Sequence, residues 1–418
     1  MKITDVVFSN GLTGFYFDDQ RAIKRDGRRD GFAYAGTPVT SGFKAVRQAG
    51  ESISVMLALE SGAVAVGDCA AVQYSGAGGR DPLFVGERYR ALLEDRLRPL
   101  LIGRELSGFR AMAAWIDELE IDGAPLHTAI RYGVSQALLA AHAQAEHRLM
   151  LEIVCAEYDL PVIAEPVPLF GQSGYDRYDG VDKMIIKEVD VLPHGLVNNV
   201  DAMLGRRGEK LLAYVEWLRD RVRKLRVSTE YQPHLHIDVY GTIGEIFAND
   251  PPRIADYIGR LEDAAEEFRL YIEGPVDLEA KAPQIDVMKA ISEAMRAKGV
   301  RAGIVADEWC NTYDDIRDFT DARCCHMVQI KTPDLGSIHN IVDSILYCKA
   351  NGMECYQGGS SNETDVSARA CLHIALAARA ERVLAKPGMG FDEGLMIVKN
   401  EMNRALALLR ARACAGGG

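Results

Sequence analysis

Four ionisable residues in the second half of the sequence each end a short apolar run, at intervals that suit a repeating fold. Asp238, Glu273 and Asp307 lie in His-Ile-Asp-Val, Tyr-Ile-Glu-Gly-Pro and Val-Ala-Asp-Glu-Trp. Lys331 follows in Val-Gln-Ile-Lys-Thr-Pro. Three carboxylates on neighbouring strand ends would repel one another unless a cation lay between them, and an all-oxygen site suits Mg²⁺. A partly desolvated lysine beside a dication has a lowered pKa and can act as a general base.

Each of these side chains also has a structural interpretation. A single acid can cap the following helix or pair with a surface arginine, and Lys331 can be a counter-ion for the acids. His194, in Pro-His-Gly, adds a second titratable group after another apolar run. A lone histidine is often structural, but a position at a strand end favours a functional one. Three acids in register, followed by a lysine, favour the metal site.

The elements that must position these residues alternate in type from about residue 160 onward. Short apolar, β-branched runs are each followed by a longer segment with helical periodicity. The strand-like runs are Val162–Ala164, Met184–Val191, Leu235–Tyr240, Leu270–Glu273, Gly303–Ala306, Met327–Lys331, Glu354–Gln357 and Val383–Ala385. The helix-like segments include Arg253–Phe268, Pro283–Lys298, Ser337–Ala350 and Asp365–Arg379. About eight such units predict a closed parallel barrel. No GxGxxG opens a helix after the first strand, as an open nucleotide-binding sheet would require.

The first 150 or so residues have a different pattern. Val6–Asp18 and Ser52–Tyr74 predict a small antiparallel sheet, and three helical segments follow, Arg88–Leu101, Ser107–Leu119 and the long Leu126–Cys155. The predicted fold is therefore α/β, a TIM-type (β/α)8 barrel with an N-terminal α+β capping domain. The predicted boundaries are 1–160 for the capping domain, 161–412 for the catalytic barrel and 413–418 for a flexible tail.

Composition and charge limit the partners and the location of the protein. The 418 residues carry 48 basic and 60 acidic side chains, a net charge of −12, which argues against nucleic acid or an anionic membrane as a partner. No apolar run approaches the roughly 20 residues of a membrane-spanning helix, and the first residues lack the pattern of a secretory signal. The 9 cysteines show no CxxC spacing, so we expect a reducing cytoplasm.

Longer motifs resemble one family. Pro-His-Gly at 193–195, His-Ile-Asp-Val-Tyr-Gly at 236–241 and Tyr-Ile-Glu-Gly-Pro at 271–275 are similar to segments of the methylaspartate ammonia-lyases, members of the enolase superfamily. The same holds for three later segments and for Gln73-Tyr-Ser-Gly in the N-terminal domain. The later segments are Ala-Asp-Glu-Trp-Cys-Asn at 306–311, Gln-Ile-Lys-Thr-Pro-Asp-Leu-Gly at 329–336 and Gly-Gly-Ser-Ser-Asn-Glu-Thr-Asp at 358–365. The resemblance extends almost to the C-terminus.

The resemblance implies an activity and a set of roles. It implies reversible elimination of ammonia from L-threo-3-methylaspartate to give mesaconate, by proton removal at C3 and a magnesium-stabilised aci-carboxylate, in glutamate fermentation. It implies Mg²⁺ on Asp238, Glu273 and Asp307, Lys331 as the base for the S-configured C3, and His194 on the opposite face. The implied substrate-binding residues are Gln73, Gln172, Gln329, Tyr356, Ser360, Ser361 and Leu384. It also implies activation by K⁺ and a homodimer. One departure is Ser360-Ser361, where the family has Thr-Cys.

Three other functions remain to be weighed. A metal-dependent hydrolase would use His234, His236 and Asp238, which alternate onto one strand face, but it needs further histidines on later strand ends. Racemases and cycloisomerases of the same superfamily usually carry a Lys-x-Lys on the second strand, and none occurs here. A binding protein on a decayed barrel would not need the intact carboxylates and lysine.

Overall fold

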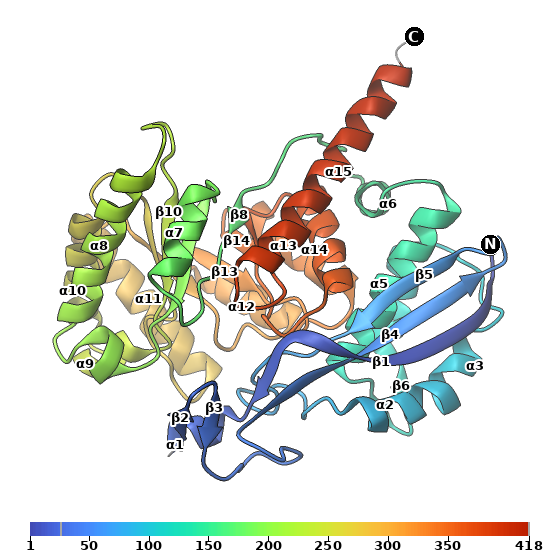
Figure 1. The fold of residues 1–418 in the computed structure, drawn as a ribbon, viewed down its shortest axis with the longest axis horizontal. Helices are drawn as coiled ribbons and strands as arrows, with labels where there is room; N and C mark the ends of the chain where they lie inside the picture. Colours follow the sequence, from blue (N-terminus) through green and yellow to red (C-terminus); the bar gives the residue numbers. More distant parts are fainter. Residues whose placement is uncertain (26, 417–418) are drawn as a thin grey trace.

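The computed structural model describes residues 1–25 and 27–416. An N-terminal part, coloured blue to cyan, packs against an α/β part that runs from green to red (Figure 1). No helix among the described residues is long and apolar enough to cross a membrane.

The α/β part is a closed barrel of eight parallel strands, as the sequence predicts. Its strands are hydrogen-bonded in the order β10-β11-β12-β13-β14-β15-β8-β9. They are β8 (Leu169–Phe170), β9 (Val191–Leu196), β10 (His234–Asp238), β11 (Leu270–Glu273), β12 (Gly303–Ala306), β13 (Met327–Ile330), β14 (Glu354–Gln357) and β15 (Arg382–Leu384). The barrel interior is filled by apolar side chains such as Phe170, Val305 and Tyr356, so the barrel is a packed core rather than a channel.

Helices cover the outside of the barrel. They are α7 (Asp179–Ile186), η2 (Val200–Leu204), α8 (Glu209–Leu225), α9 (Thr242–Phe247), α10 (Pro251–Ala265), α11 (Lys281–Ala297), α12 (Tyr313–Ala322), α13 (Ile338–Ala350), α14 (Asp365–Ala378) and α15 (Asp392–Gly416). Thr364 caps α14, because its hydroxyl accepts a hydrogen bond from Ser367 N and satisfies one free N–H of the first turn.

The first two barrel strands differ from the sequence prediction. Residues 162–164 lie outside any strand, and the first strand is the two-residue β8. Most of Met184–Val191 is not a strand either, because its first residues belong to α7. Met184 and Ile185 are buried whereas Ile186 is 70% exposed, which is the spacing of a helix with one buried side. The second strand, β9, begins only at Val191 and contains His194.

The N-terminal part is built on a three-stranded antiparallel sheet, β1-β4-β5. Its strands are β1 (Ile3–Asp18), β2 (Arg28–Asp30), β3 (Ala33–Ala35), β4 (Arg47–Leu59), β5 (Val64–Cys69), β6 (Glu120–Ile121) and β7 (Ala124–Pro125). Its helices are α1 (Gln20–Arg25), α2 (Gly86–Leu92), η1 (Leu93–Leu97), α3 (Arg98–Leu101), α4 (Phe109–Glu118), α5 (Thr128–Ala145) and α6 (Met150–Glu157). The predicted α+β character is therefore present.

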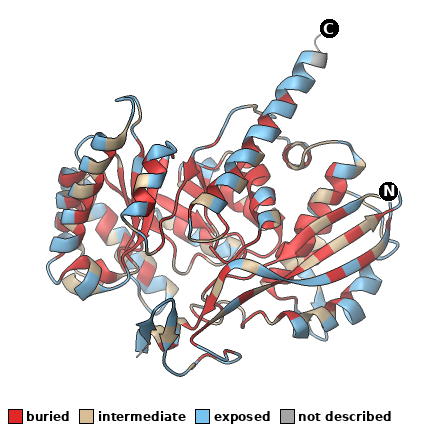
Figure 2. Cartoon of the chain, viewed as in Figure 1, coloured by how far each residue is buried: buried red, intermediate tan, exposed pale blue. Residues whose placement is uncertain are grey.

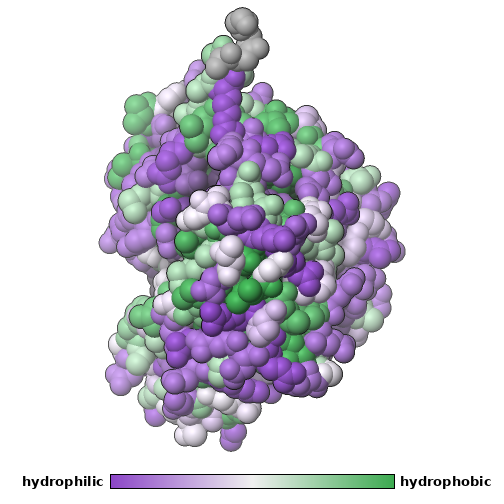
Figure 3. Space-filling view, turned by 90° about the vertical axis from the view of Figure 1, so that its right-hand side faces the viewer, coloured by the Kyte–Doolittle hydropathy of each residue, from purple (hydrophilic) through white to green (hydrophobic). Residues whose placement is uncertain are grey.

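Helix α5 lies very close to strand β5. A Cβ added to Gly133 of α5 would be 2.4 Å from Cys69 N, so only glycine allows this approach. Buried residues, drawn in red in Figure 2, run along this contact and through the barrel. On the outer face seen in Figure 3, hydrophilic side chains predominate and hydrophobic ones are scattered among them, as expected for a solvent-exposed surface.

Two further predictions are changed by the structure. The long helix expected over Leu126–Cys155 is two helices, α5 and α6, because the chain turns at His147, whose φ is 54°. Helix α15 continues to Gly416, so residues 413–416 of the predicted tail are helical, and 417–418 lie outside the described residues.

Candidate active site

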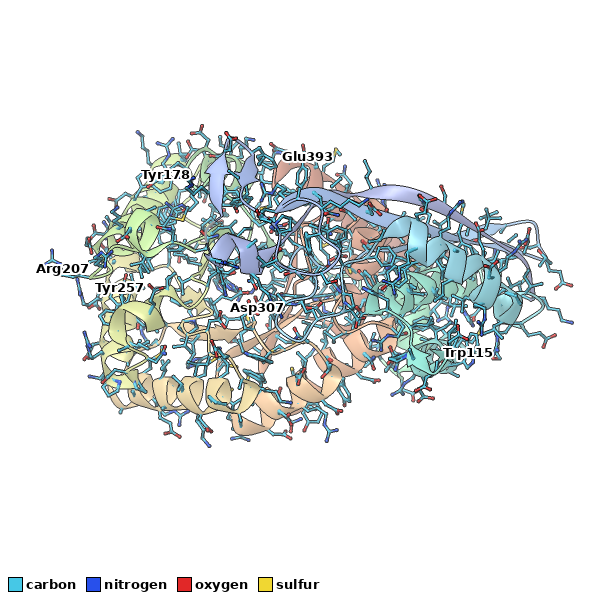
Figure 4. The ribbon with its side chains drawn as sticks, turned by 90° about the horizontal axis from the view of Figure 1, so that it is seen from below. Trp115, Tyr178, Arg207, Tyr257, Asp307 and Glu393 are labelled. Carbon is cyan, nitrogen blue, oxygen red and sulfur yellow. The ribbon has the colours of Figure 1, made fainter. Side chains whose placement is uncertain are left out.

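Two carboxylates meet at the carboxyl ends of neighbouring strands. Asp238 ends β10, Glu273 ends β11, and the two residues are paired in the register of these parallel strands. Asp307 follows directly after β12. All three are buried, with exposed fractions of 3%, 0% and 8%. The β-sheet register therefore places the three acids of the sequence motif at one end of the barrel, and Figure 4 shows Asp307 near the middle of the molecule, where the two parts meet.

These acids destabilise one another's charge. Burial and the nearby charges of Glu273 and Asp307 raise the pKa of Asp238 well above its usual value. Burial also raises the pKa of Asp307 to about 7, although Lys331 opposes the shift. Buried acids in such a cluster are stabilised by a bound dication, which offsets both the desolvation and the repulsion. The donor set fits Mg²⁺, which prefers carboxylate oxygens.

A histidine also reaches this cluster. Possible ligand atoms of His194, Asp238 and Glu273 all lie within 4.8 Å of one another, and His194 Nε2 is 3.9 Å from Glu273 Oε2. Burial lowers the pKa of His194 to about 4, so its imidazole is neutral near pH 7. The histidine predicted from Pro-His-Gly therefore lies beside the carboxylates.

Glu273 is held by three side chains from the barrel interior. His236 Nε2 lies 2.7 Å from one carboxylate oxygen, Gln329 Nε2 donates to the other at 2.6 Å, and Tyr356 OH donates at 2.9 Å. This network fixes the orientation of the carboxylate. His236 is thus an interior residue, and His234 begins β10 at the other end of the strand. The histidine pair of a hydrolase is therefore not formed.

Lys331 follows β13 and contacts the third acid. Its Nζ lies 2.6 Å from Asp307 Oδ1. Burial alone would lower the pKa of Lys331, but the charge of Asp307 raises it above the usual value. The sequence analysis predicted a lowered pKa for Lys331 because it assumed a divalent cation nearby. The charge of such a cation would oppose that of Asp307.

The predicted substrate-binding residues surround one small cavity. It is lined by ten of the residues singled out in the sequence, namely Gln73, Gln172, His194, Asp238, Asp307, Gln329, Lys331, Ser360, Ser361 and Leu384. Glu273 and Tyr356 lie behind this lining, joined to each other by the hydrogen bonds above. Within the described part of the chain Gln329 Oε1 is buried without a partner, which leaves it free to accept a hydrogen bond from a ligand.

Arg80 was not predicted to be part of the site. It comes from the N-terminal part and also lines the cavity, together with Glu308. Its guanidinium pairs with Asp334 at 2.8 Å and with Glu308 at 3.4 Å. Glu308 could have been predicted as a site residue, because it follows Asp307 in Ala-Asp-Glu-Trp. Nothing in the sequence around Arg80 shows which residues its side chain contacts.

The loop that carries Ser360 and Ser361 contacts both parts of the molecule. Ser360 Oγ accepts a hydrogen bond from Gln73 N at 3.1 Å, and Ser361 Oγ donates to Gln172 Oε1 at 3.3 Å. Below the loop, Glu363 Oε1 accepts from Ser360 N at 3.0 Å and from Lys386 Nζ at 2.7 Å. Both side chains of the Glu363–Lys386 pair are 0% exposed.

Replacing Glu363 with glutamine is expected to destabilise the protein strongly. The variant leaves Lys386 charged in a fully buried site, and breaking such a pair by removing one partner costs about 3–5 kcal/mol. Denaturant unfolding of the variant and the parent measures the difference in unfolding free energy. Glu105→Gln, which removes an exposed pair with Lys2, is the control and should cost less than about 1 kcal/mol. Equal unfolding midpoints for Glu363→Gln and the parent would contradict this account.

Comparisons with known proteins agree with this geometry. A family model described as methylaspartate ammonia-lyase N-terminus matches residues 1–159, and one described as methylaspartate ammonia-lyase C-terminus matches residues 161–411. The chain is 62% identical over 412 residues to the methylaspartate ammonia-lyase of Citrobacter amalonaticus, covering 99% of this chain and 100% of the relative.

Two solved structures are also similar. One is Citrobacter amalonaticus methylaspartate ammonia lyase containing (2S,3S)-3-methylaspartic acid, with a TM-score of 0.97 and 62% identity over 98% of this chain and 100% of that one. The other is the magnesium complex of β-methylaspartase from Clostridium tetanomorphum, with a TM-score of 0.95 and 57% identity over 99% of this chain and 100% of that one.

Proposed function

This chain belongs to the methylaspartate ammonia-lyase family, and we propose how its barrel site carries out the reaction. The protein is a carbon–nitrogen lyase that eliminates ammonia from L-threo-3-methylaspartate to give mesaconate, reversibly. The observation that carries the assignment of roles is the buried pair of Asp238 and Glu273 beside the Asp307–Lys331 contact of 2.6 Å.

Asp238, Glu273 and Asp307 would hold Mg²⁺. The burial and mutual repulsion of the three carboxylates support this assignment, and a related enzyme has been solved as a magnesium complex. When bound, Mg²⁺ supplies a Lewis acid that stabilises the negative charge which proton removal places on the substrate carboxylate.

Lys331 would remove the proton from C3. Its amine must be neutral for this step, and Asp307 keeps Nζ in place at 2.6 Å. The electron pair of the C3–H bond then forms the C2=C3 double bond, while the C2–N bond breaks and ammonia departs with its electrons. Gln329 lines the cavity, and within the described part of the chain its Oε1 has no hydrogen-bond partner, so it would hold an N–H of the leaving amine.

His194 would act on the opposite face of C3, on the proton of the (2S,3R) epimer. Its neutral imidazole can accept a proton, and a positioned general base contributes about 10²–10⁴-fold in rate. We therefore expect His194→Ala to lower kcat/KM for this epimer by about that factor, and to affect the (2S,3S) substrate far less. Initial rates with both epimers measure the difference. An equal loss with both would assign His194 to a substrate carboxylate instead.

Three further properties are proposed on family resemblance alone. They are activation by K⁺, assembly into a homodimer and a location in the cytoplasm. Replacing K⁺ with tetramethylammonium at constant ionic strength tests the first, and a rate that does not change would contradict it. Sedimentation of the purified chain tests the second, since a homodimer has twice the mass of the 418-residue chain.

Ultraviolet absorbance tests the function directly. Incubation with L-threo-3-methylaspartate, Mg²⁺ and K⁺ should produce the absorbance of the conjugated alkene, together with an equal amount of ammonia. EDTA should abolish both signals, and added Mg²⁺ should restore them. If a folded protein supplied with Mg²⁺ produced neither alkene nor ammonia, the proposed reaction would be ruled out.

A further inference from the structure

The side chain of Gln73 is held from behind by a buried acid. Gln73 lines the cavity, and its Nε2 donates to Asp18 Oδ2 at 2.7 Å. Asp18 is the last residue of β1 and is 0% exposed. The two backbones are also joined, since Asp18 N donates to Gln73 O at 3.0 Å. Asp18 is therefore placed to fix the side chain of Gln73, although it is not among the residues that line the cavity.

Asp18 can only accept hydrogen bonds here. Arg47, the first residue of β4, donates to it through two nitrogens, from Nε to Oδ1 and from Nη2 to Oδ2, each at 2.7 Å. The guanidinium is itself fixed, because it donates to Phe32 O at 2.8 Å and lies 4.7 Å from the centre of the Phe32 ring. Both carboxylate oxygens therefore serve as acceptors of the guanidinium, and the Gln73 amide can meet them only with its N–H.

This pair decides which end of the Gln73 amide faces the cavity. The amide nitrogen must point to Asp18, so the amide oxygen is left for the cavity. An oxygen there accepts a hydrogen bond from the substrate ammonium. In the reverse reaction it holds ammonia by an N–H and leaves the nitrogen lone pair free to attack C2. An amide turned the other way would instead donate to that lone pair and block the attack.

We propose that Asp18, held by Arg47, is a positioning residue for the amine, which it orients through the Gln73 amide. The inference rests on the proposed function, because the ammonium group is the only hydrogen-bond donor of 3-methylaspartate and an amide oxygen of Gln73 can only accept. It identifies the ligand of this corner of the cavity as an amine with at least one N–H.

Asp18→Asn tests the inference in the direction of ammonia addition to mesaconate. The asparagine can present its own N–H to Gln73, so the Gln73 amide is free to turn around. We expect the KM for ammonia to rise about tenfold, as for the loss of one hydrogen bond. The KM for mesaconate should change less than about twofold, because Gln73 contacts the amine and not the alkene.

A double-mutant cycle separates positioning from a general structural role. In a Gln73→Ala background, Asp18→Asn should leave the KM for ammonia unchanged, because the side chain through which Asp18 acts is absent. A rise that persists in this background would overturn the inference, as would an unchanged KM in the single variant. If Asp18→Asn does not fold, Arg47→Lys replaces it, since lysine cannot hold both oxygens of Asp18 in the same way, and the same cycle is measured.

Asp117→Asn is the matched control. It also removes a carboxylate from a pair with an arginine, here the partly buried pair with Arg131 at 3.1 Å, but Asp117 lies outside the cavity lining. It should lower the melting temperature without a selective change in the KM for ammonia, and a selective change would overturn the inference. If the parent protein adds no ammonia to mesaconate at all, the proposed function fails, and the inference fails with it. If the parent is active and the cycle shows no coupling, only the inference fails.

Discussion

Lys331→Ala is expected to lower kcat for L-threo-3-methylaspartate by about 10²–10⁴-fold, the contribution of a positioned general base. Lys331 Nζ is the titratable amine at the carboxyl end of the barrel that contacts Asp307. Alanine keeps the strand intact and removes only the group that takes the C3 proton. The measurement is the initial rate of alkene formation at saturating Mg²⁺, with exchange of the C3 proton for solvent deuterium followed separately.

The exchange measurement distinguishes the two roles available to Lys331. A base is needed for exchange as well as for elimination, so both should fall together. Lys281→Ala is the matched control, because Lys281 is likewise a lysine paired with acids but lies outside the cavity lining. Its Nζ is 2.8 Å from Asp315 and 2.6 Å from Asp318. Its activity should equal that of the parent. Full exchange by Lys331→Ala would show that the lysine is only a counter-ion of Asp307.

Glu273→Gln is expected to raise the Mg²⁺ concentration for half-maximal activity by about 10–100-fold, or more, and to lower kcat. Even residues that only support a metal ligand are worth about 10–100-fold in affinity, and here a carboxylate ligand itself becomes a neutral amide. Glu273 is 0% exposed and bonded to His236, Gln329 and Tyr356, so its replacement cannot be compensated by a shift of the side chain.

Isothermal titration with Mg²⁺ and activity at increasing Mg²⁺ measure this effect independently. The control is Glu354→Gln, because Glu354 is also a barrel-strand acid, bonded to Tyr271 OH at 2.9 Å, but it begins β14 and lies at the opposite end of the barrel. Its magnesium requirement should match the parent. An unchanged requirement in Glu273→Gln would remove Glu273 from the metal site.

The strand-end residues were predictable from the sequence because parallel register leaves little freedom. Once Asp238 and Glu273 end neighbouring strands, the hydrogen-bond ladder brings them to the same level. The apolar runs before them were also long enough to recognise. The prediction failed where this signal was weak. Two-residue β8 has no pattern of its own, and the apolar residues of α7 imitate a strand.

Residues that depend on the docking of the two parts could not be found this way. Arg80 reaches Glu308 and Asp334 across more than 200 positions of sequence. The side-chain contacts that decide these positions are set by how the sheet packs on the barrel, which periodicity does not encode. The raised pKa of Lys331 has a different origin within the barrel, since it depends on the distance to Asp307.

The division of the cavity between two segments has a consequence for how new activities arise. The groups assigned to proton removal lie in or directly after barrel strands, whereas Gln73, Asp18 and Arg47 are supplied by the first 75 residues. If Gln73, Asp18 and Arg47 orient the amine as we propose, a change in them alters which amine is admitted and leaves the acid–base machinery in place. Laboratory evolution toward other amine donors should therefore accumulate its substitutions in the N-terminal segment, so that donor range and chemical step can be selected separately.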